Sequence, residues 1–200
     1  MLLSDIILET PALIQDVDDT YLQDIHQNQA RLHQLARYPM DHVYSITENL
    51  VVMHVHEPTG EEVYMAVDHK SMKIVYYMMY EVHQDPLIGR YVNQAMVWLD
   101  KTYSPAKGLP KRVFFDQLVK KYDTVLTDSI QTWNGRAFWM RRLQEAFQKG
   151  FNVYFVDLER NKVEKLEDFA DISKFNEKYH IWEPHGFHKR LAITKRKLSK

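Results

Sequence analysis

The chain has no cysteine and few residues that break regular structure. Among its 200 residues are 6 glycines and 7 prolines, and cysteine is absent. The lack of cysteine excludes disulfides, thiol nucleophiles and thiolate metal ligands, and it is typical of a reducing compartment. The longest uncharged apolar run in the middle of the chain, Ile74 to Tyr80, is far shorter than the roughly 20 residues that span a bilayer. We therefore expect a cytoplasmic protein that does not enter a membrane.

Charge is balanced over the whole chain but not along it. Lys and Arg number 26 and Asp and Glu number 27, so the formal net charge of -1 indicates no charged partner. Residues 1–30 include acids and no Lys or Arg, whereas residues 186–200 include basic residues and no acid. Such ends can bind partners of opposite charge, or can be solvated surface in which the two charges offset each other.

Hydrophobic periodicity predicts an α/β (α+β) fold with a mixed, mostly antiparallel sheet flanked by helices. We expect an acidic helical segment at 1–42, with its helix at Asp18–Arg37, and a domain at 43–200 with a basic C-terminal tail. Expected strands are Val43–Glu57, Glu61–Asp68, Lys73–His83, Gln94–Asp100, Thr124–Ile130, Asn152–Leu158, Val163–Leu166 and Arg190–Thr194, and further helices are Lys111–Tyr122 and Asn134–Lys149. The run Tyr76–Tyr80 lacks a polar side, which predicts a strand buried on both faces.

Two segments resemble a known family. Val97-Trp98-Leu99, followed by Tyr103-Ser-Pro-Ala-Lys-Gly-Leu-Pro110 and a helix, resembles the GNAT N-acyltransferase superfamily over residues 43–166. Leu126-Thr-Asp-Ser-Ile-Gln-Thr-Trp-Asn-Gly-Arg-Ala-Phe-Trp139 is similar to a run in GNAT-like proteins encoded by bacteriophages. The resemblance implies a GNAT-like sheet, acetyl-CoA as cofactor and an amine as acyl acceptor, in a host cytoplasm or a virion.

The resemblance places acyl-CoA at the glycine loop. In the family, the strand before this loop splays from the next strand and pairs with the pantetheine arm, and loop N-H groups bind the pyrophosphate, as helix N-termini generally can. Gly108 matches the central glycine of the motif, whereas Pro105 and Pro110 replace an Arg or Gln and a small residue. The implied cofactor-binding residues are Val97, Leu99, Lys107, Gly108, Leu109, Lys111, Arg112 and Asn134.

Acyl transfer to an amine requires a base for the amine proton and a donor for the thioester or the departing thiolate. Asp128 and Asp100 are the candidate bases, and Tyr103 or Ser129 is the candidate proton donor. Asp128 and Ser129 could instead hydrogen bond a polar turn, and Asp100 could be an ordinary surface acid.

A third motif position differs from the family. The family's second helix carries a tyrosine acid just before a Gly-Phe pair, and here Ala146 or Phe147 precedes Gly150-Phe151. Neither side chain can donate a proton. The sequence therefore also allows a catalytically degenerate GNAT-fold bacteriophage protein, which would act as a binding or structural protein in the virion or on the host.

Two further groups of residues have a functional and a structural interpretation. His54 and His56 share a strand face beside Glu57, as a metal pair would, but spacing fixes no third ligand. We therefore expect an exposed strand face and no metal site. Aromatic side chains that stack on bases, together with the charge of the basic tail, could bind nucleic acid. The alternation of Leu191 and Ile193 in this tail favours instead an edge strand with its charges outward.

Overall fold

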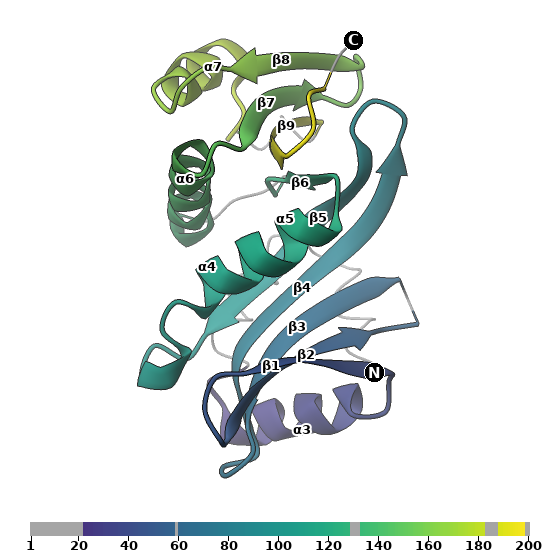
Figure 1. The fold of residues 1–200 in the computed structure, drawn as a ribbon, viewed down its shortest axis with the longest axis vertical. Coiled ribbons are helices and arrows are strands. Elements are labelled where there is room, and N and C mark those ends of the chain that lie inside the picture. The colour runs from purple at the N-terminus through teal and green to yellow at the C-terminus, as the bar shows by residue number, and fades with distance from the viewer. Residues whose placement is uncertain (1–21, 59, 129–132, 183–187, 199–200) are drawn as a thin grey trace. The chain divides into compact units, whose positions relative to one another are not determined.

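The structure, a computed structural model, describes residues 22–58, 60–128, 133–182 and 188–198. These residues form a mixed α/β fold whose nine strands are hydrogen bonded in the order β1-β2-β3-β4-β5-β6-β9-β7-β8 (Figure 1). The pairs between β5 and β6 are parallel, and the other strand pairs that we describe are antiparallel. The predicted fold class, a mixed and mostly antiparallel sheet with helices, is thus confirmed.

The chain forms two compact units, described separately below. The first comprises Met1–Glu81 and Ala95–Val113, and the second comprises Val82–Gln94 and Phe114–Lys200. The first unit contains α3 (Ile25–Leu35), β1 (Met40–Ser45), β2 (Leu50–His56), β3 (Glu61–Asp68), η1 (Ser104–Ala106), α4 (Leu109–Val113) and parts of β4 (Lys73–Asp85) and β5 (Gly89–Leu99). The second contains the rest of β4 and β5 with η2 (Phe114–Leu118), α5 (Val119–Lys121), β6 (Thr124–Leu126), α6 (Trp133–Gln148), β7 (Asn152–Asp157), β8 (Lys162–Leu166), α7 (Asp171–Tyr179) and β9 (Lys189–Thr194).

In the first unit, α3 packs on one face of the sheet. The Asp24 side chain caps the helix by accepting hydrogen bonds from the N-H groups of His26 and Gln27, at 2.9 and 3.0 Å. Its apolar side chains Leu32 and Leu35 join a buried cluster with residues of β2 to β5. The cluster also contains Val55, Val63, Met65, Val67, Ile74, Tyr77, Met79 and Trp98. We call this side of the first unit's sheet the α3 face.

Strand β4 is buried on both faces over most of the part that belongs to the first unit. Residues Ile74 to Tyr80 are all buried, as their unbroken apolar pattern predicts. Tyr77 and Met79 belong to the cluster on the α3 face. Because side chains alternate along a strand, Tyr76, Met78 and Tyr80 point to the opposite face.

The second unit has its own aromatic and aliphatic core. Trp139 of α6 is buried, and its ring and the Phe114 ring meet in a T-shaped contact with centroids 5.7 Å apart. A separate cluster joins Ile88, Leu126, Tyr154, Val156 and Ala192 from the β4–β5 turn and strands β6, β7 and β9.

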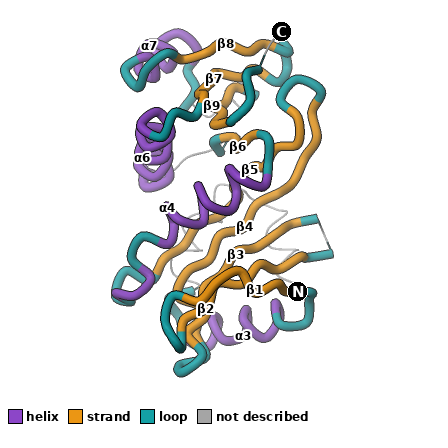
Figure 2. Tube along the Cα trace, viewed as in Figure 1, coloured by secondary structure: helices purple, strands orange, loops and turns teal. Residues whose placement is uncertain are grey.

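Several predicted elements differ from the structure, as the helices and strands marked in Figure 2 show. The predicted strand Val43–Glu57 is wrong: β1 and β2 are separated by a turn, in which the N-H of Leu50 donates to Thr47 Oγ1 at 3.1 Å. Helix α3 begins at Ile25, and the start predicted for this helix at Asp18 lies outside the described residues. Helix α7 was not predicted.

The expected edge strand in the basic tail is also wrong. Strand β9 lies between β6 and β7 and is hydrogen bonded to both. Leu191, Ala192 and Ile193 are all buried, so the run is apolar because both of its faces are covered. Arg190, in the same strand, is buried as well. Part of the basic tail is therefore sheet interior and not a charged surface.

Among the described residues, no helix combines the length and the apolar character that crossing a membrane requires.

The side chain of Asn28 acts as a substitute strand partner for β4. Its Nδ2 donates to the carbonyl oxygens of Leu22 and Ile74, at 2.9 and 2.8 Å, and its Oδ1 accepts from the N-H of Ile74 at 2.8 Å. Asn28 is fully buried, so water cannot replace these bonds.

We predict that Asn28→Ala lowers the free energy of unfolding by about 2–4 kcal/mol, because it leaves buried backbone groups of Ile74 unpaired. Urea denaturation measures the change, and Gln27→Ala on the exposed side of α3 is the matched control. Equal stability of the two variants would contradict the role of Asn28.

A buried ion pair also joins α3 to the sheet. Arg31 Nη2 donates to Glu57 Oε1 at 2.7 Å and to the Tyr77 hydroxyl at 2.5 Å, and both charged side chains are almost fully buried. Burial raises the pKa of Glu57 above its usual 4.5, and the charge of Arg31 opposes that rise. The carboxylate therefore depends on Arg31 to stay ionised at low cost.

We predict that Arg31→Met destabilises the fold by about 3–5 kcal/mol near pH 7. Without Arg31 the pKa of Glu57 in the folded state rises further above its unfolded value, so ionisation of Glu57 opposes folding. The loss of unfolding free energy therefore grows as pH rises from the unfolded-state pKa to the folded-state pKa. Urea denaturation near pH 4 and near pH 7 measures this difference, with exposed Arg37→Met as control. A pH-independent loss would show that the charge of Glu57 is not involved.

Candidate functional site

The C-terminal half of β5 extends beyond its ladder with β6. Tyr91, Val92 and Asn93 pair with Thr124, Val125 and Leu126, and β5 then continues to Leu99. Trp98 points to the α3 face, so Val97 and Leu99 point to the other face. Val97 and Leu99 are half-buried apolar residues, unlike the fully covered centre of β4.

A surface cleft lies at the end of this strand. It has a volume of about 360 Å³ and is lined by Gln23, Lys73, Trp98, Leu99, Asp100, Lys101 and Thr102. This volume falls within the range of small-molecule sites. The lining combines one buried aromatic ring with two lysines and one carboxylate, so the cleft offers apolar contact and one positive charge in excess.

Asp100, a predicted base, is engaged in an ion pair at this cleft. Its carboxylate accepts from Lys73 Nζ at 2.6 Å and from the N-H and hydroxyl of Thr102 at 2.9 and 2.6 Å. Burial alone raises the pKa of Asp100, but the bonds from Lys73 and Thr102 outweigh it and hold the pKa below its usual range. A carboxylate held in this way is a weak proton acceptor.

Tyr103, the predicted proton donor, is similarly engaged. Burial, the charge of Asp68 and a hydrogen bond to Asp68 all raise the pKa of Tyr103. Asp68 also accepts from the Ser71 hydroxyl at 2.7 Å in the turn between β3 and β4. A phenol whose pKa is raised gives up its proton less readily.

The predicted phosphate loop is a glycine turn before α4. Gly108 has φ +90°, a conformation that favours glycine, and a Cβ placed there would meet no atom within 4 Å. Pro110 occupies the first turn of α4, where its missing N-H costs least. Lys107, Lys111 and Arg112 are all exposed around this turn.

Helix α4 lies on the face opposite α3. The Arg112 guanidinium stacks on the ring of Tyr44 at 3.8 Å, and Tyr44 is directly opposite Val52. Met53, next to Val52, packs on the α3 cluster, so Val52 and Tyr44 point to the other face because side chains alternate along a strand. The structure therefore brings Arg112, Val97 and Leu99 to one face of the first unit, which we call the α4 face.

The remaining predicted site residues belong to the second unit. Asp128 faces Arg190, whose pKa is lowered by burial to about 10 although Asp128 opposes the shift. The backbone of Asn134 is part of the first turn of α6. Ser129 lies outside the described residues.

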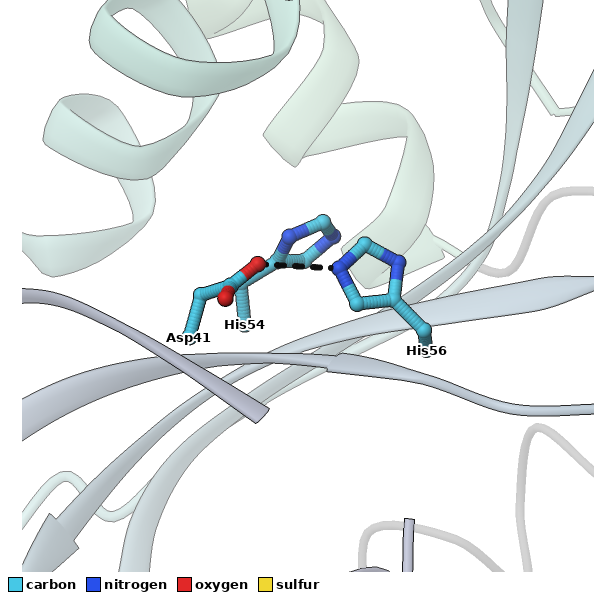
Figure 3. A group of neighbouring side chains, drawn as sticks. All are labelled: Asp41, His54 and His56. Atoms are coloured by element: carbon cyan, nitrogen blue, oxygen red, sulfur yellow. Dashed lines mark hydrogen bonds and ion pairs between the residues drawn. The ribbon is translucent and has the colours of Figure 1, made fainter. Parts of the chain in front are cut away.

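The α4 face also holds a cluster of polar side chains that the sequence only partly indicated, and Figure 3 shows three of them, Asp41, His54 and His56. In the strand register, Asp41 of β1 is opposite His54 of β2, and His56 is opposite Glu62 of β3. Glu62 is in turn opposite Tyr80 of β4. The alternation of His54 and His56 was visible in the sequence, but Asp41, Glu62 and Tyr80 join them only through pairing across strands. We call these five residues the polar cluster.

His54 is the buried centre of the polar cluster, and the expected exposed strand face is wrong at this residue. His54 is 5% exposed, and its Nε2 lies 2.8 Å from the Tyr80 hydroxyl and 2.7 Å from Glu62 Oε2. The Tyr80 hydroxyl donates to the same Glu62 oxygen at 2.9 Å. The His54 ring stacks on Tyr64 at 4.4 Å, and burial raises the pKa of Tyr64 to about 12.

The outer part of the polar cluster reaches solvent. His56 Nε2 lies 3.1 Å from Asp41 Oδ2, and the two side chains are 41% and 74% exposed. Ligand atoms of Asp41, His54 and His56 lie within 4.8 Å of one another, so these three residues could hold a metal ion.

Comparison of the chain with models of protein families and with curated protein sequences found no match.

We predict that Glu62→Ala destabilises the fold by about 2–3 kcal/mol and Tyr80→Phe by about 1 kcal/mol. The Glu62 carboxylate accepts from two buried groups, the Tyr80 hydroxyl and His54 Nε2. Loss of the Tyr80 hydroxyl removes only its own bonds and leaves the contact between His54 and Glu62 in place. Urea denaturation measures both values, with Glu48→Ala in the exposed β1–β2 turn as control. A Tyr80→Phe cost equal to that of Glu62→Ala would show that Glu62 is not the shared acceptor.

Proposed function

We propose that this chain is a GNAT-like protein that binds acyl-CoA through β5 and the Gly108 turn of its first unit. The observation that carries the proposal is that β5 continues for six residues, Gln94 to Leu99, beyond its last pair with β6. In the resembled family this strand region leaves its neighbour and pairs with the pantetheine arm. Half-buried Val97 and Leu99 would offer that arm an apolar surface.

The Gly108 turn supports the same proposal through charge and conformation. Exposed Lys107, Lys111 and Arg112 place positive charge around a turn whose glycine needs a left-handed φ. Positive charge next to exposed backbone N-H groups attracts a pyrophosphate. The cleft of about 360 Å³ at the end of β5 adds Lys101 beside an apolar wall, whereas the charge of Lys73 is offset by Asp100.

Binding is better supported than transfer. Asp100 is held as a carboxylate by Lys73 and Thr102, and the pKa of Tyr103 is raised beside Asp68. Neither group has a pKa shifted in the direction that acid-base catalysis needs. This observation favours, as the second candidate, a catalytically degenerate GNAT-fold bacteriophage protein that uses its surface for a macromolecular partner. N-acyl transfer to an amine remains the activity that the family resemblance implies, with Asp128 as the other candidate base.

We predict that isothermal titration of the protein with acetyl-CoA and with free CoA detects one site per chain. Lys107→Glu should weaken binding by about tenfold, because a charge of the wrong sign then faces the pyrophosphate. Lys70→Glu, an exposed lysine in the β3–β4 turn, is the matched control and should leave affinity unchanged.

If no heat of binding is detected at millimolar ligand, the acyl-CoA proposal is contradicted and the search turns to a macromolecular partner. Release of CoA thiol in the presence of mixed amines separates the two candidates once binding is seen. Thiol release that depends on both the amine and the protein indicates a transferase, and binding without release indicates the degenerate protein.

A further inference from the structure

Within the polar cluster, two imidazoles and the carboxylate of Asp41 lie on one face of the sheet, in a pattern that suits a metal ion. His54 and His56 are two residues apart on β2, and Asp41 is directly opposite His54 on β1 (Figure 3). These placements follow from the antiparallel register, so the backbone itself brings the three side chains together. Such a preformed arrangement reduces the ordering that a metal ion would have to impose.

The distances are close to those of a coordination sphere. His56 Nε2 and Asp41 Oδ2 are 3.1 Å apart, and one ligand atom from each of the three residues lies within 4.8 Å of the others. Ligand atoms of a tetrahedral zinc site are about 3.4 Å apart, because metal-nitrogen and metal-oxygen bonds are about 2.0–2.2 Å long. Asp41 and His56 both reach solvent, so their side chains can move toward the buried His54.

Glu62 supplies the support that metal-bound histidines usually have. Its Oε2 lies 2.7 Å from His54 Nε2 and 4.0 Å from His56 Nδ1. A proton on His54 Nε2 that donates to Glu62 puts the ring's lone pair on Nδ1. The carboxylate behind His54 fixes the orientation of this ring and strengthens the imidazole as a ligand, whereas Glu62 lies too far from His56 for a hydrogen bond.

We propose that Asp41, His54 and His56 bind a divalent transition metal of the Zn²⁺ type, with Glu62 and Tyr80 holding His54 in place. Imidazole and carboxylate ligands suit Zn²⁺ and its neighbours better than Ca²⁺ or Mg²⁺, which prefer oxygen alone. The two carboxylates of the cluster offset the charge of the ion. Three protein ligands at a solvent-exposed rim leave a coordination position for water or an anion, as in open zinc sites.

The test is Zn²⁺ binding by equilibrium dialysis, together with the visible absorption of Co²⁺ as a substitute ion. We expect one Zn²⁺ per chain and a Co²⁺ spectrum different from that of the hydrated ion. His56→Ala and Asp41→Ala should each weaken Zn²⁺ binding at least about tenfold, because each removes a ligand. Both residues are on the exposed side of the cluster, so these variants should keep the fold, which circular dichroism checks.

His69→Ala is the matched control, since this histidine is exposed in the β3–β4 turn outside the polar cluster. Its Zn²⁺ affinity should equal that of the original chain. Absence of Zn²⁺ binding, or equal affinity in His56→Ala and His69→Ala, would overturn the proposal and leave the cluster as a hydrogen-bonded network. The acyl-CoA titration uses Lys107→Glu, so the two proposals can fail independently.

Discussion

The pairing register of β1, β2 and β3 is the constraint on which the first unit depends. With Val55 opposite Val63 and Met53 opposite Met65, one face of the sheet is apolar and receives α3. The same register puts His54 and His56 on the other face, beside Asp41 and Glu62. A slip of one residue would exchange the two faces of β2, burying imidazoles under α3 and removing the polar cluster. Core and candidate metal site are therefore two consequences of one alignment.

Each face of this sheet also contains a buried polar group that the neighbouring elements must pair. Arg31 enters the α3 face and is matched there by Glu57 and Tyr77. His54 is buried on the α4 face and is matched by Glu62 and Tyr80. Such groups add little net stability when they are paired and cost much when they are not, so they specify which elements meet more than how strongly. The pairing of buried polar groups thus specifies which elements pack together, which apolar contacts alone would specify less closely.

The sequence predicted much of what depends on local pattern and missed what depends on pairing. Strand β3 was predicted with its observed limits, and the burial of Tyr76 to Tyr80 followed from the absence of a polar side. The β1–β2 turn was missed, because Ser45 to Asn49 interrupt one apolar run only briefly, and β9 was placed at an edge although it is inserted between β6 and β7. At the polar cluster, the shared face of His54 and His56 was predictable from period two. The contributions of Asp41 and Glu62 were not, since cross-strand register is not encoded in the spacing of one strand.

The proposed function makes different demands on the first unit for binding a cofactor and for using it. Under the proposal, acyl-CoA would need a strand edge, an apolar surface and positive charge, which β5, Val97 and Lys107 would supply without any proton transfer. Catalysis would in addition need a base that is not already satisfied. The ion pair between Lys73 and Asp100 lowers the energy of the carboxylate in the resting protein, and that stabilisation must be given up before Asp100 can accept a proton. The interaction that orders the end of β5 is thus the one that weakens Asp100 as a catalyst, which is why a protein with this site would retain affinity more easily than activity.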